Sequence, residues 1–261
     1  MRLSPFALLD ALIAPPPEAE RRSFLAAQPY THRGLHGDNI PENSRAAFSA
    51  AIAIGHGIEL DVQAARDGEA FVFHDAKLDR LTHQTGAFAS LPAAVLEKIG
   101  LRNSDETIPR LPDILDHVAG RVPILIEIKT VGDKVGVLCL SVRRALEGYQ
   151  GEIAVMSFNP AVGRWFREHA PRYTRGLVVS ESGPAGIAAS LTRWAQRRIG
   201  LWRAQPDFLA YDVRDFPSRF AARQRKRGLT VLTWTVRTAS DERAAFANAD
   251  EIIYEKPDTR T

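Results

Sequence analysis

The stretch GIELDVQAARDGEAFVFHD, residues 57–75, contains the pattern that decides the fold. Its first half is an apolar run interrupted by Glu59 and Asp61, which at positions i and i+2 lie on one face of a strand. An Asp-Gly turn signal follows, and the apolar run after it predicts the returning arm of a hairpin that ends at His74. The hairpin therefore brings a histidine back beside Asp61.

Outward from this hairpin, strand-like runs alternate with amphipathic segments of helical length, which predicts a parallel sheet with right-handed crossovers. Strands are expected over residues 30–33, 57–62, 122–129, 152–158, 175–180, 207–212, 229–236 and 250–254. Helices are expected over residues 44–54, 134–147, 161–169, 184–198, 216–227 and 241–248. Eight such strands close a TIM barrel. We therefore predict an α/β fold, a single (β/α)8 barrel over residues 29–261 with a β-hairpin after its second strand, preceded by an N-terminal extension over residues 1–28.

The composition is that of an ordinary globular protein. The 261 residues are 45% hydrophobic and 25% charged, which is near the globular average and predicts a full core. A net charge of +3 is too small to indicate a nucleic-acid partner, although a pI near 9.2 suits an anionic substrate. A lone cysteine, Cys139, forms no intramolecular disulfide and is compatible with a reducing compartment. No apolar run approaches the roughly 20 residues of a membrane span, so we expect a cytoplasmic protein.

Three carboxylates lie near the ends of expected strands. Glu59 and Asp61 belong to the strand over residues 57–62, and Glu127 belongs to the strand over residues 122–129. The carboxyl ends of barrel strands hold the active site, so these side chains should converge. All-oxygen ligation without cysteine or paired histidine favours one divalent cation, Mg²⁺ or Ca²⁺, over Zn²⁺. The competing interpretation, in which each carboxylate pairs with an arginine or lysine, is weaker for three together than for one.

Two histidines and two cations complete this constellation. His32 ends the first expected strand, and His74 ends the hairpin, so a pair of imidazoles is available as general acid and general base near neutral pH. Arg33 can hold a phosphate through two hydrogen bonds, and Lys129 can act on it as a point charge. We predict a metal-assisted phosphate site in which His32 and His74 are catalytic and Arg33 and Lys129 bind substrate. Lys129 need not contact Glu127, although the two lie on the same strand face.

Three further residues are candidates for supporting roles. Asn43 is expected to cap the helix that starts near residue 44. Glu42 and Asn43 are also placed to hold side chains of the site, with Glu42 as a partner of the metal ligands or of Arg33. Trp234, at a late strand end, is expected to bind the glycerol or alcohol part of a substrate, with core packing nearly as well supported.

The polar residues belong to an ordered set of motifs. These are HRG at 32–34, PENS at 41–44, IELDV at 58–62, DG at 67–68, FHDAKL at 73–78, IPRL at 108–111, IEIK at 126–129 and WTV at 234–236. The set covers nearly the whole chain and resembles the glycerophosphodiester phosphodiesterases of the bacterial cytosolic type. The resemblance implies metal-dependent hydrolysis of a small-molecule glycerophosphodiester to glycerol 3-phosphate and an alcohol, on a TIM barrel.

The same resemblance implies roles for individual residues. It makes Glu59, Asp61 and Glu127 the metal ligands, and it makes His32 and His74 the acid/base pair without deciding which is which. In the family, the nucleophile is water or the substrate's own glycerol hydroxyl, which gives a cyclic phosphate.

The chain departs from the family pattern in three places. It has RLT at residues 80–82 where the family usually has Arg-Thr-Thr, and YEKP at residues 254–257 where the family usually has Thr-Asp-x-Pro. It also has an additional HGD at residues 36–38. We expect none of these segments to touch the catalytic set, and all of them to alter the rim that selects the alcohol.

One segment outside the motifs, RWAQRRIGLWR at residues 193–203, interleaves basic residues with two tryptophans, as membrane- or nucleic-acid-binding surfaces do. We favour a helix whose face of Leu191, Trp194, Ala195 and Arg198 packs on the barrel while the arginines are solvated.

Alternatives remain open at this level. If the basic and aromatic segment met a membrane surface, the activity would be that of a lysophospholipase D or a phospholipid-cleaving phosphodiesterase. A non-catalytic phosphodiester-binding barrel is the alternative from another class. A metal-dependent amidohydrolase is disfavoured, because its first strand typically offers His-x-His and here Arg33 and Gly34 follow His32. We expect a monomer or homodimer without a nucleic-acid partner.

Overall fold

A computed structural model describes residues 10, 13–14, 20–130, 132–181 and 187–255, without the side chains of residues 187–190. The chain forms two compact units. The site unit comprises residues 29–153 and continues from residue 254, and the companion unit comprises residues up to 28 together with residues 154–253. The division into an extension over residues 1–28 and one barrel domain stays a prediction.

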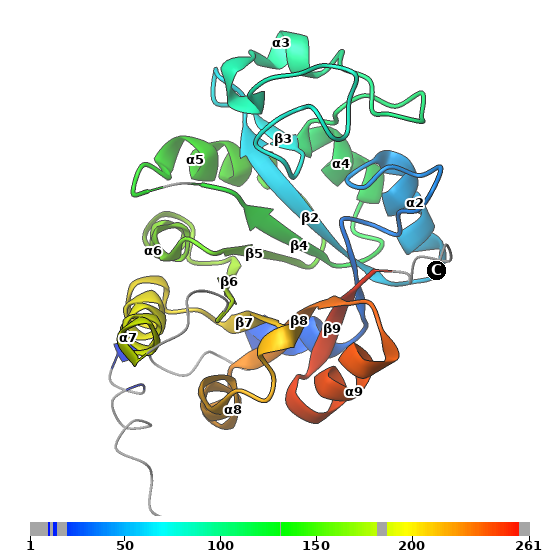
Figure 1. The fold of residues 1–261 in the computed structure, drawn as a ribbon. Helices are drawn as coiled ribbons and strands as arrows, with labels where there is room; N and C mark the ends of the chain where they lie inside the picture. Colours follow the sequence, from blue (N-terminus) through cyan, green and yellow to red (C-terminus); the bar gives the residue numbers. More distant parts are fainter. Residues whose placement is uncertain (1–9, 11–12, 15–19, 131, 182–186, 256–261) are drawn as a thin grey trace, which may run out of the picture. The chain divides into compact units, whose positions relative to one another are not determined.

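The site unit contains the hairpin and the strands next to it. Strand β2 (Gly57–Ala64) pairs in parallel with β1 (Tyr30–His32) and β4 (Ile124–Ile128), and antiparallel with β3 (Ala70–Val72), which confirms the hairpin (Figure 1). The helices of this unit are α2 (Arg45–Ala53), η2 (Phe88–Ser90), α3 (Ala93–Leu96), α4 (Leu111–Val118) and α5 (Gly136–Ala145). The sequence analysis did not predict η2, α3 or α4.

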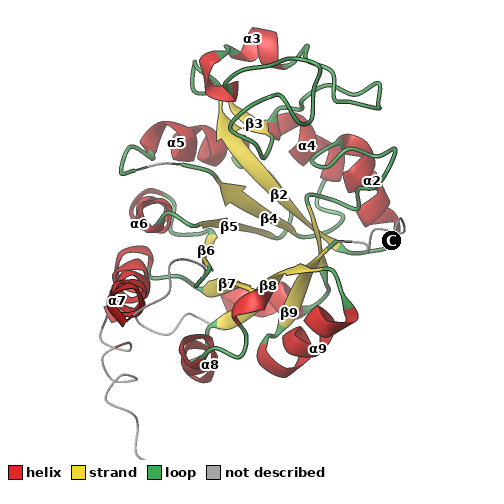
Figure 2. Ribbon diagram, viewed as in Figure 1, coloured by secondary structure: helices red, strands yellow, loops and turns green. Residues whose placement is uncertain are grey.

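The companion unit repeats strand and helix more regularly (Figure 2). Its strands are β5 (Ile153–Ser157), β6 (Thr174–Val179), β7 (Phe208–Asp212), β8 (Thr230–Val236) and β9 (Glu251–Tyr254). The first residue of β5 and the last residue of β9 are assigned to the site unit. Its helices are η1 (Glu20–Ala26), α6 (Pro160–His169), α7 (Ile187–Ala204), η3 (Val213–Asp215), α8 (Arg219–Lys226) and α9 (Ala239–Asn248). The pairs β5–β6, β6–β7 and β7–β8 are all parallel.

The strand order of the sheet is β1-β9-β8-β7-β6-β5-β4-β2-β3, and β1 also pairs with β2. Eight parallel strands joined through helices, with β3 as the hairpin arm, are the (β/α)8 barrel that the sequence predicted. The expected strand boundaries agree with the observed ones to within two residues. In the described part of the chain, no helix combines the length and the hydropathy needed to cross a membrane.

The segment that follows the hairpin has its own hydrophobic core. Phe73 at the end of the hairpin stacks on Phe88 with ring centroids 5.1 Å apart, and Phe71 meets Phe88 edge-on. These rings are buried together with Leu96 and Ile108, so the long connection from β3 to α4 is anchored by apolar contacts. This anchoring fixes the position of the residues directly after Phe73, where His74 begins the loop.

Helix α7 buries only Arg198 of the face that we predicted. Leu191 is 63% exposed and Trp194 is 38% exposed, whereas Arg198, Leu201 and Ala204 are buried at three-residue spacing. The expectation that the arginines are solvated was also wrong for Arg198, because its guanidinium lies 3.4 Å from the fully buried carboxylate of Asp10. Leu201 and Ala204 belong to a buried hydrophobic cluster with Leu177 of β6 and Leu209 of β7, so these residues pack the helix against the strands.

Candidate active site

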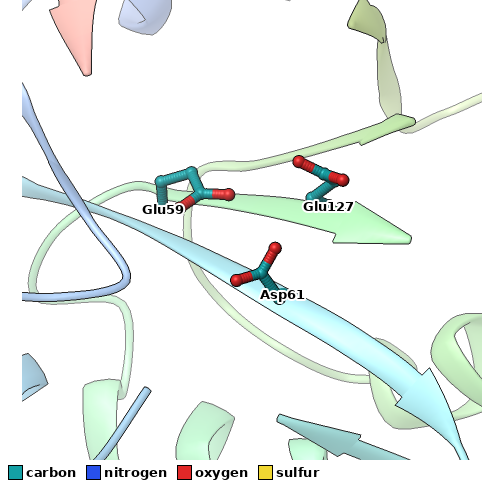
Figure 3. Close-up of side chains that lie close together, drawn as sticks. All are labelled: Glu59, Asp61 and Glu127. Atoms are coloured by element: carbon teal, nitrogen blue, oxygen red, sulfur yellow. The ribbon is translucent and has the colours of Figure 1, made fainter. Parts of the chain in front are cut away.

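Strand register brings the three predicted carboxylates together. Glu59 and Asp61 share one face of β2, and Asp61 lies opposite Glu127 in the parallel β2–β4 pair. One carboxylate oxygen of each residue lies within 4.8 Å of the others (Figure 3). The predicted convergence is therefore present, and it follows from two strands whose side chains alternate with the same period.

These carboxylates are buried, and their charges interact strongly. Glu59 and Asp61 are each 1% exposed, and Glu127 is 9% exposed. Burial raises the pKa of Glu59 well above its usual value, and the neighbouring charges of Asp61 and Glu127 raise it further. Burial also raises the pKa of Glu127. The pKa of Asp61 is lowered instead, because the cations Lys129 and Arg33 outweigh the effect of burial.

Lys129 and Arg33 lie against this cluster. Lys129 Nζ is 2.8 Å from Glu127 Oε1 and 3.0 Å from Asp61 Oδ1, so it does contact its neighbour on the strand. Burial alone would lower the pKa of Lys129, but Asp61 and Glu127 raise it above its usual value. Arg33 Nε is 3.2 Å from Asp61 Oδ2, and the Arg33 backbone N–H donates to Glu59 Oε2. Both cations are therefore held beside the carboxylates as predicted.

Asn43 does not cap α2, contrary to our prediction. The N-cap is Ser44, whose side chain accepts a hydrogen bond from the Ala47 backbone N–H. Asn43 instead has a φ of 57°, a left-handed conformation that asparagine tolerates, and its side-chain amide donates to Asp61 Oδ2. The Asp61 backbone N–H donates in return to Asn43 Oδ1 at 3.3 Å. Asn43 therefore holds Asp61 in place, which is the supporting position assigned to it above.

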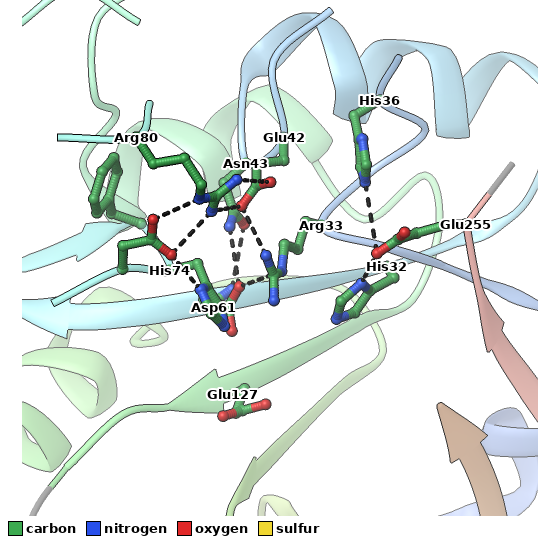
Figure 4. Close-up of polar contacts among 12 residues, drawn as sticks. His32, Arg33, His36, Glu42, Asn43, Asp61, His74, Arg80, Glu127 and Glu255 are labelled. Carbon is green, nitrogen blue, oxygen red and sulfur yellow. Dashed lines mark hydrogen bonds and ion pairs between the residues drawn. The ribbon is translucent and has the colours of Figure 1, made fainter. Parts of the chain in front are cut away.

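Each histidine has a carboxylate partner. His32 Nδ1 lies 2.5 Å from Glu255 Oε1, and His74 Nδ1 lies 2.7 Å from Asp75 Oδ1 (Figure 4). Burial lowers the pKa of both imidazoles. Such pairs orient the ring and leave the other nitrogen, Nε2, for chemistry.

One of the segments that depart from the family pattern touches the catalytic set, so that expectation was wrong for Glu255, and the other two contact residues beside the set. Glu255 replaces the usual aspartate and contacts His32, while His36 Nε2 lies 4.0 Å from the same Glu255 carboxylate. Arg80 contacts both Glu42 and Asp75. Glu42 itself accepts from Arg33 Nη1 at 2.8 Å, as predicted for a supporting residue.

Glu255, Asp75 and Arg80 were missed as site residues. The sequence signal that could have identified them was their position: Asp75 lies in the FHDAKL motif, and Arg80 and Glu255 lie in segments that align with the family pattern.

Trp234 belongs to the companion unit, whereas the other candidates belong to the site unit. Its Nε1 donates to the Ala210 carbonyl oxygen at 3.0 Å, and its ring meets Phe158 edge-on at 5.5 Å. These contacts fix the ring at the carboxyl end of β8. Its assignment to substrate binding stays a prediction.

The carboxylate cluster fits a hard divalent cation. Its donors are oxygens only, and they lie within the roughly 5 Å that two ligands of one Ca²⁺ can span, while Mg²⁺ would require them to close to about 4 Å. Lys129 offsets part of the charge of Asp61 and Glu127, whereas Glu59 has no ion pair with a lysine or arginine side chain in the described part of the chain. The cluster therefore has negative charge to spare for a cation.

Comparison with known proteins agrees with this geometry. The sequence model of the glycerophosphoryl diester phosphodiesterase family matches residues 32–259. A glycerophosphodiester phosphodiesterase of Caldanaerobacter subterraneus is 28% identical over 248 residues, which cover 87% of this chain and 93% of the relative. Glycerophosphodiester phosphodiesterase 1 of Rattus norvegicus is 24% identical over 271 residues, which cover 87% of this chain and 78% of the relative.

The fold is also found among solved structures. A phosphodiesterase of Oleispira antarctica, solved in complex with the product sn-glycerol-3-phosphate, superposes with a TM-score of 0.74 at 22% identity. The superposition covers 87% of this chain and 92% of the other. Because the family model spans nearly all of the sequence from His32 onward, the chain belongs to the glycerophosphoryl diester phosphodiesterase family.

Proposed function

We propose that this enzyme hydrolyses glycerophosphodiesters to glycerol 3-phosphate and a free alcohol, using one divalent cation and two histidines. The observation that carries the proposal is the buried cluster of Glu59, Asp61 and Glu127, flanked by two cations and by two imidazoles that each have a carboxylate partner. A structural ion-pair cluster would need neither the surplus negative charge nor the paired histidines.

The three carboxylates would hold the cation, Mg²⁺ or Ca²⁺, through their oxygens. When bound, the cation polarises a phosphate oxygen and stabilises negative charge on it. Asn43 keeps Asp61 in position through two hydrogen bonds, and the Arg33 backbone N–H holds Glu59 through one hydrogen bond. The ligand set is thereby oriented before substrate arrives.

Arg33 and Lys129 bind the phosphate group of the substrate. Arg33 is fixed by Glu42 and Asp61, so its guanidinium is directed before substrate binds. Lys129 stays protonated, because the neighbouring carboxylates hold its pKa above the usual value. Fixed positive charge at this position offsets the negative charge that develops on the phosphate oxygens.

The two histidines move the protons. One imidazole takes a proton from the attacking oxygen through Nε2, and the other gives a proton to the oxygen of the departing alcohol as its bond to phosphorus breaks. The attacking oxygen is that of water or of the substrate's glycerol hydroxyl. In the second case water opens a cyclic phosphate afterwards, and both routes consume one water in total.

The test is release of glycerol 3-phosphate from glycerophosphocholine and glycerophosphoethanolamine with Mg²⁺, with Ca²⁺ and with chelator. We expect cation-dependent release, and we expect His32→Ala or His74→Ala to lower turnover by ~10²- to 10⁴-fold. The His74→Ala protein also controls for contaminating activity. Wild-type turnover in either variant would remove that histidine from the mechanism, and full activity in chelator would exclude the metal-assisted route.

A second candidate is cleavage of lysophospholipids at a membrane surface. The exposed apolar residues of α7 favour it, because Leu191, Ile199 and Trp202 are 63%, 51% and 59% exposed on a helix that carries several arginines. Sedimentation with vesicles of anionic phospholipid tests this candidate. Binding to anionic vesicles and alcohol release from embedded lysophospholipid would support it, and an unbound protein would exclude it.

A further inference from the structure

Arg80 joins two carboxylates that belong to different parts of the candidate site. On one edge of its guanidinium, Nε and Nη2 donate to the two oxygens of Asp75 at 2.6 and 2.9 Å. On the adjacent edge, Nη1 and Nη2 donate to the two oxygens of Glu42 at 2.7 and 2.8 Å. The guanidinium thus binds both carboxylates through two hydrogen bonds each (Figure 4).

The oxygens that Arg80 Nη2 contacts are the ones that hold the functional side chains. Asp75 Oδ1 accepts from Arg80 and also pairs with His74 Nδ1 at 2.7 Å. Glu42 Oε1 accepts from Arg80 and also from Arg33 Nη1 at 2.8 Å. A continuous chain of contacts therefore runs from His74 through Asp75, Arg80 and Glu42 to Arg33.

We propose that Arg80 is a positioning residue that sets the orientation of His74 relative to the phosphate-binding Arg33. The proposal rests on the function proposed above, in which His74 transfers a proton and Arg33 binds phosphate. Among the described residues, Arg80 has no hydrogen bond or ion pair with Glu59, Asp61 or Glu127, and it acts through the two carboxylates.

The arrangement also selects one form of the His74 ring. An ionised carboxylate only accepts hydrogen bonds, so Asp75 requires a proton on His74 Nδ1 and leaves Nε2 unprotonated in the neutral ring. Hydrogen bonds from Arg80 and His74 outweigh the burial of Asp75 and lower its pKa to about 2, so it is an anion throughout the physiological range.

A general role in stability does not explain this geometry. The Arg80 side chain is 49% exposed, and exposed ion pairs contribute little to folding. Only a planar guanidinium can donate two hydrogen bonds to each of two carboxylates, whereas an ammonium acts as a point charge. Lysine at this position would keep the charge but lose the bridge.

The test is Arg80→Lys, with Arg110→Lys as the matched control. Arg110 donates from Nε and Nη2 to Glu97 Oε2 in the same unit, so this control also breaks an arginine–carboxylate contact. The primary readout is the ¹⁵N spectrum of the His74 ring in histidine-labelled protein, and the second is the split of kcat and KM for glycerophosphocholine.

In the wild type and in Arg110→Lys, we expect His74 to be protonated at Nδ1 when neutral. In Arg80→Lys, Asp75 loses its two-point anchor and can rotate away from His74, so we expect both neutral forms of the ring to be populated and kcat to fall ~10²-fold. We expect KM to rise because Glu42, which holds Arg33, loses the same anchor. An unchanged His74 spectrum in a folded Arg80→Lys protein would overturn the proposal. If that variant does not fold, Arg80→Gln removes the hydrogen bonds that Nε and Nη2 donate together to Asp75 and must give the same spectral change.

The spectral readout separates failure of this inference from failure of the proposed function. A wild type that shows the fixed Nδ1–H form but releases no glycerol 3-phosphate would reject the reaction while keeping Arg80 as the residue that orients His74. A catalytically active enzyme with an unaltered His74 in Arg80→Lys would keep the reaction and reject the role of Arg80.

Discussion

Replacing Glu59 with glutamine should stabilise the metal-free protein while abolishing its use of a cation. Glu59 is 1% exposed, and one of its carboxylate oxygens lies within 4.8 Å of one oxygen each of Asp61 and Glu127. Two like unit charges about 4.8 Å apart repel by about 3.5 kcal/mol at an effective dielectric constant of about 20. Glutamine removes this charge and keeps an oxygen that can accept from the Arg33 backbone N–H.

Protonation sets an upper limit to the gain. The pKa of Glu59 is raised in the folded state, so the wild type loses stability as pH rises above the unfolded value of 4.5 toward the folded value. At pH 7 this loss cannot exceed about 3.4 kcal/mol, which is about 1.36 kcal/mol for each of 2.5 pH units. Since Arg33 offsets part of the repulsion, we expect Glu59→Gln to gain about 1–3 kcal/mol, or about 2–6 °C in Tm for a chain of this length.

The assay is calorimetric melting in chelator between pH 4.5 and pH 8. The gain in Tm should be largest near neutral pH and should nearly disappear at pH 4.5, where the carboxyl group is neutral in the folded state and only about half ionised in the unfolded state. Glu97→Gln is the control, because it removes a half-exposed carboxylate paired with Arg110 and should change stability by less than about 1 kcal/mol. A Glu59→Gln protein that melts at or below the wild-type temperature at pH 7 in chelator would refute this reasoning.

Three further predictions follow from the same contacts. Asn43→Ala should weaken Ca²⁺ binding by about 10- to 100-fold in calorimetric titrations, because it removes the support of Asp61, and wild-type affinity would contradict this. Burial lowers the pKa of His32 and His74, so the neutral imidazoles persist to acidic pH. The acid limb of the pH profile of kcat/KM should therefore have its midpoint below pH 6.5, and a midpoint above pH 6.5 would count against both histidines as general bases. Glu255→Gln should lower kcat by about 10- to 100-fold through loss of His32 orientation, and an unchanged kcat would exclude that role.

The strands and the carboxylate cluster were predictable because their signals are local. Apolar runs of strand length alternate with helical segments, and the spacing of Glu59 and Asp61 assigns both to one face of β2. The hairpin follows from a turn signal between two apolar runs. In its returning arm, the Phe73 backbone N–H donates a hydrogen bond to the Asp61 carbonyl oxygen. Each inference needed only a few neighbouring residues and the spacing at which side chains repeat on one face of a strand or helix.

Choices between neighbouring residues or helix faces were harder to predict. Asn43 and Ser44 are both good N-cap residues, and the positive φ of Asn43 decides the matter in the folded chain. On α7, the spacing of Leu191 and Trp194 suggested a buried face, but Leu201 and Ala204 lie in the core instead. The partner of buried Arg198 is Asp10, which lies far away in the sequence, so no helical period could indicate it.

The contacts that orient the histidines show the same limit at the site. Glu255 is 223 residues from His32, and Arg80 is 38 residues from Glu42. No local pattern links such pairs, and the family motifs mark the positions without stating which side chains meet. We therefore assigned the change from the family's aspartate to Glu255 to the rim that selects the alcohol, although the glutamate side chain contacts His32.

The distribution of positive charge favours one of the two interpretations of the carboxylates. If each carboxylate existed to balance a cation, Glu59 should have one of its own. Lys129 contacts Asp61 and Glu127, and the Arg33 guanidinium contacts Asp61. Glu59 receives a backbone N–H and lies 3.9 Å from His32 Nε2, an imidazole whose pKa is lowered by burial. A buried carboxylate with so little compensation costs stability, and a bound divalent cation would remove that cost, so this arrangement supports the proposed cation binding over a purely structural role for the cluster.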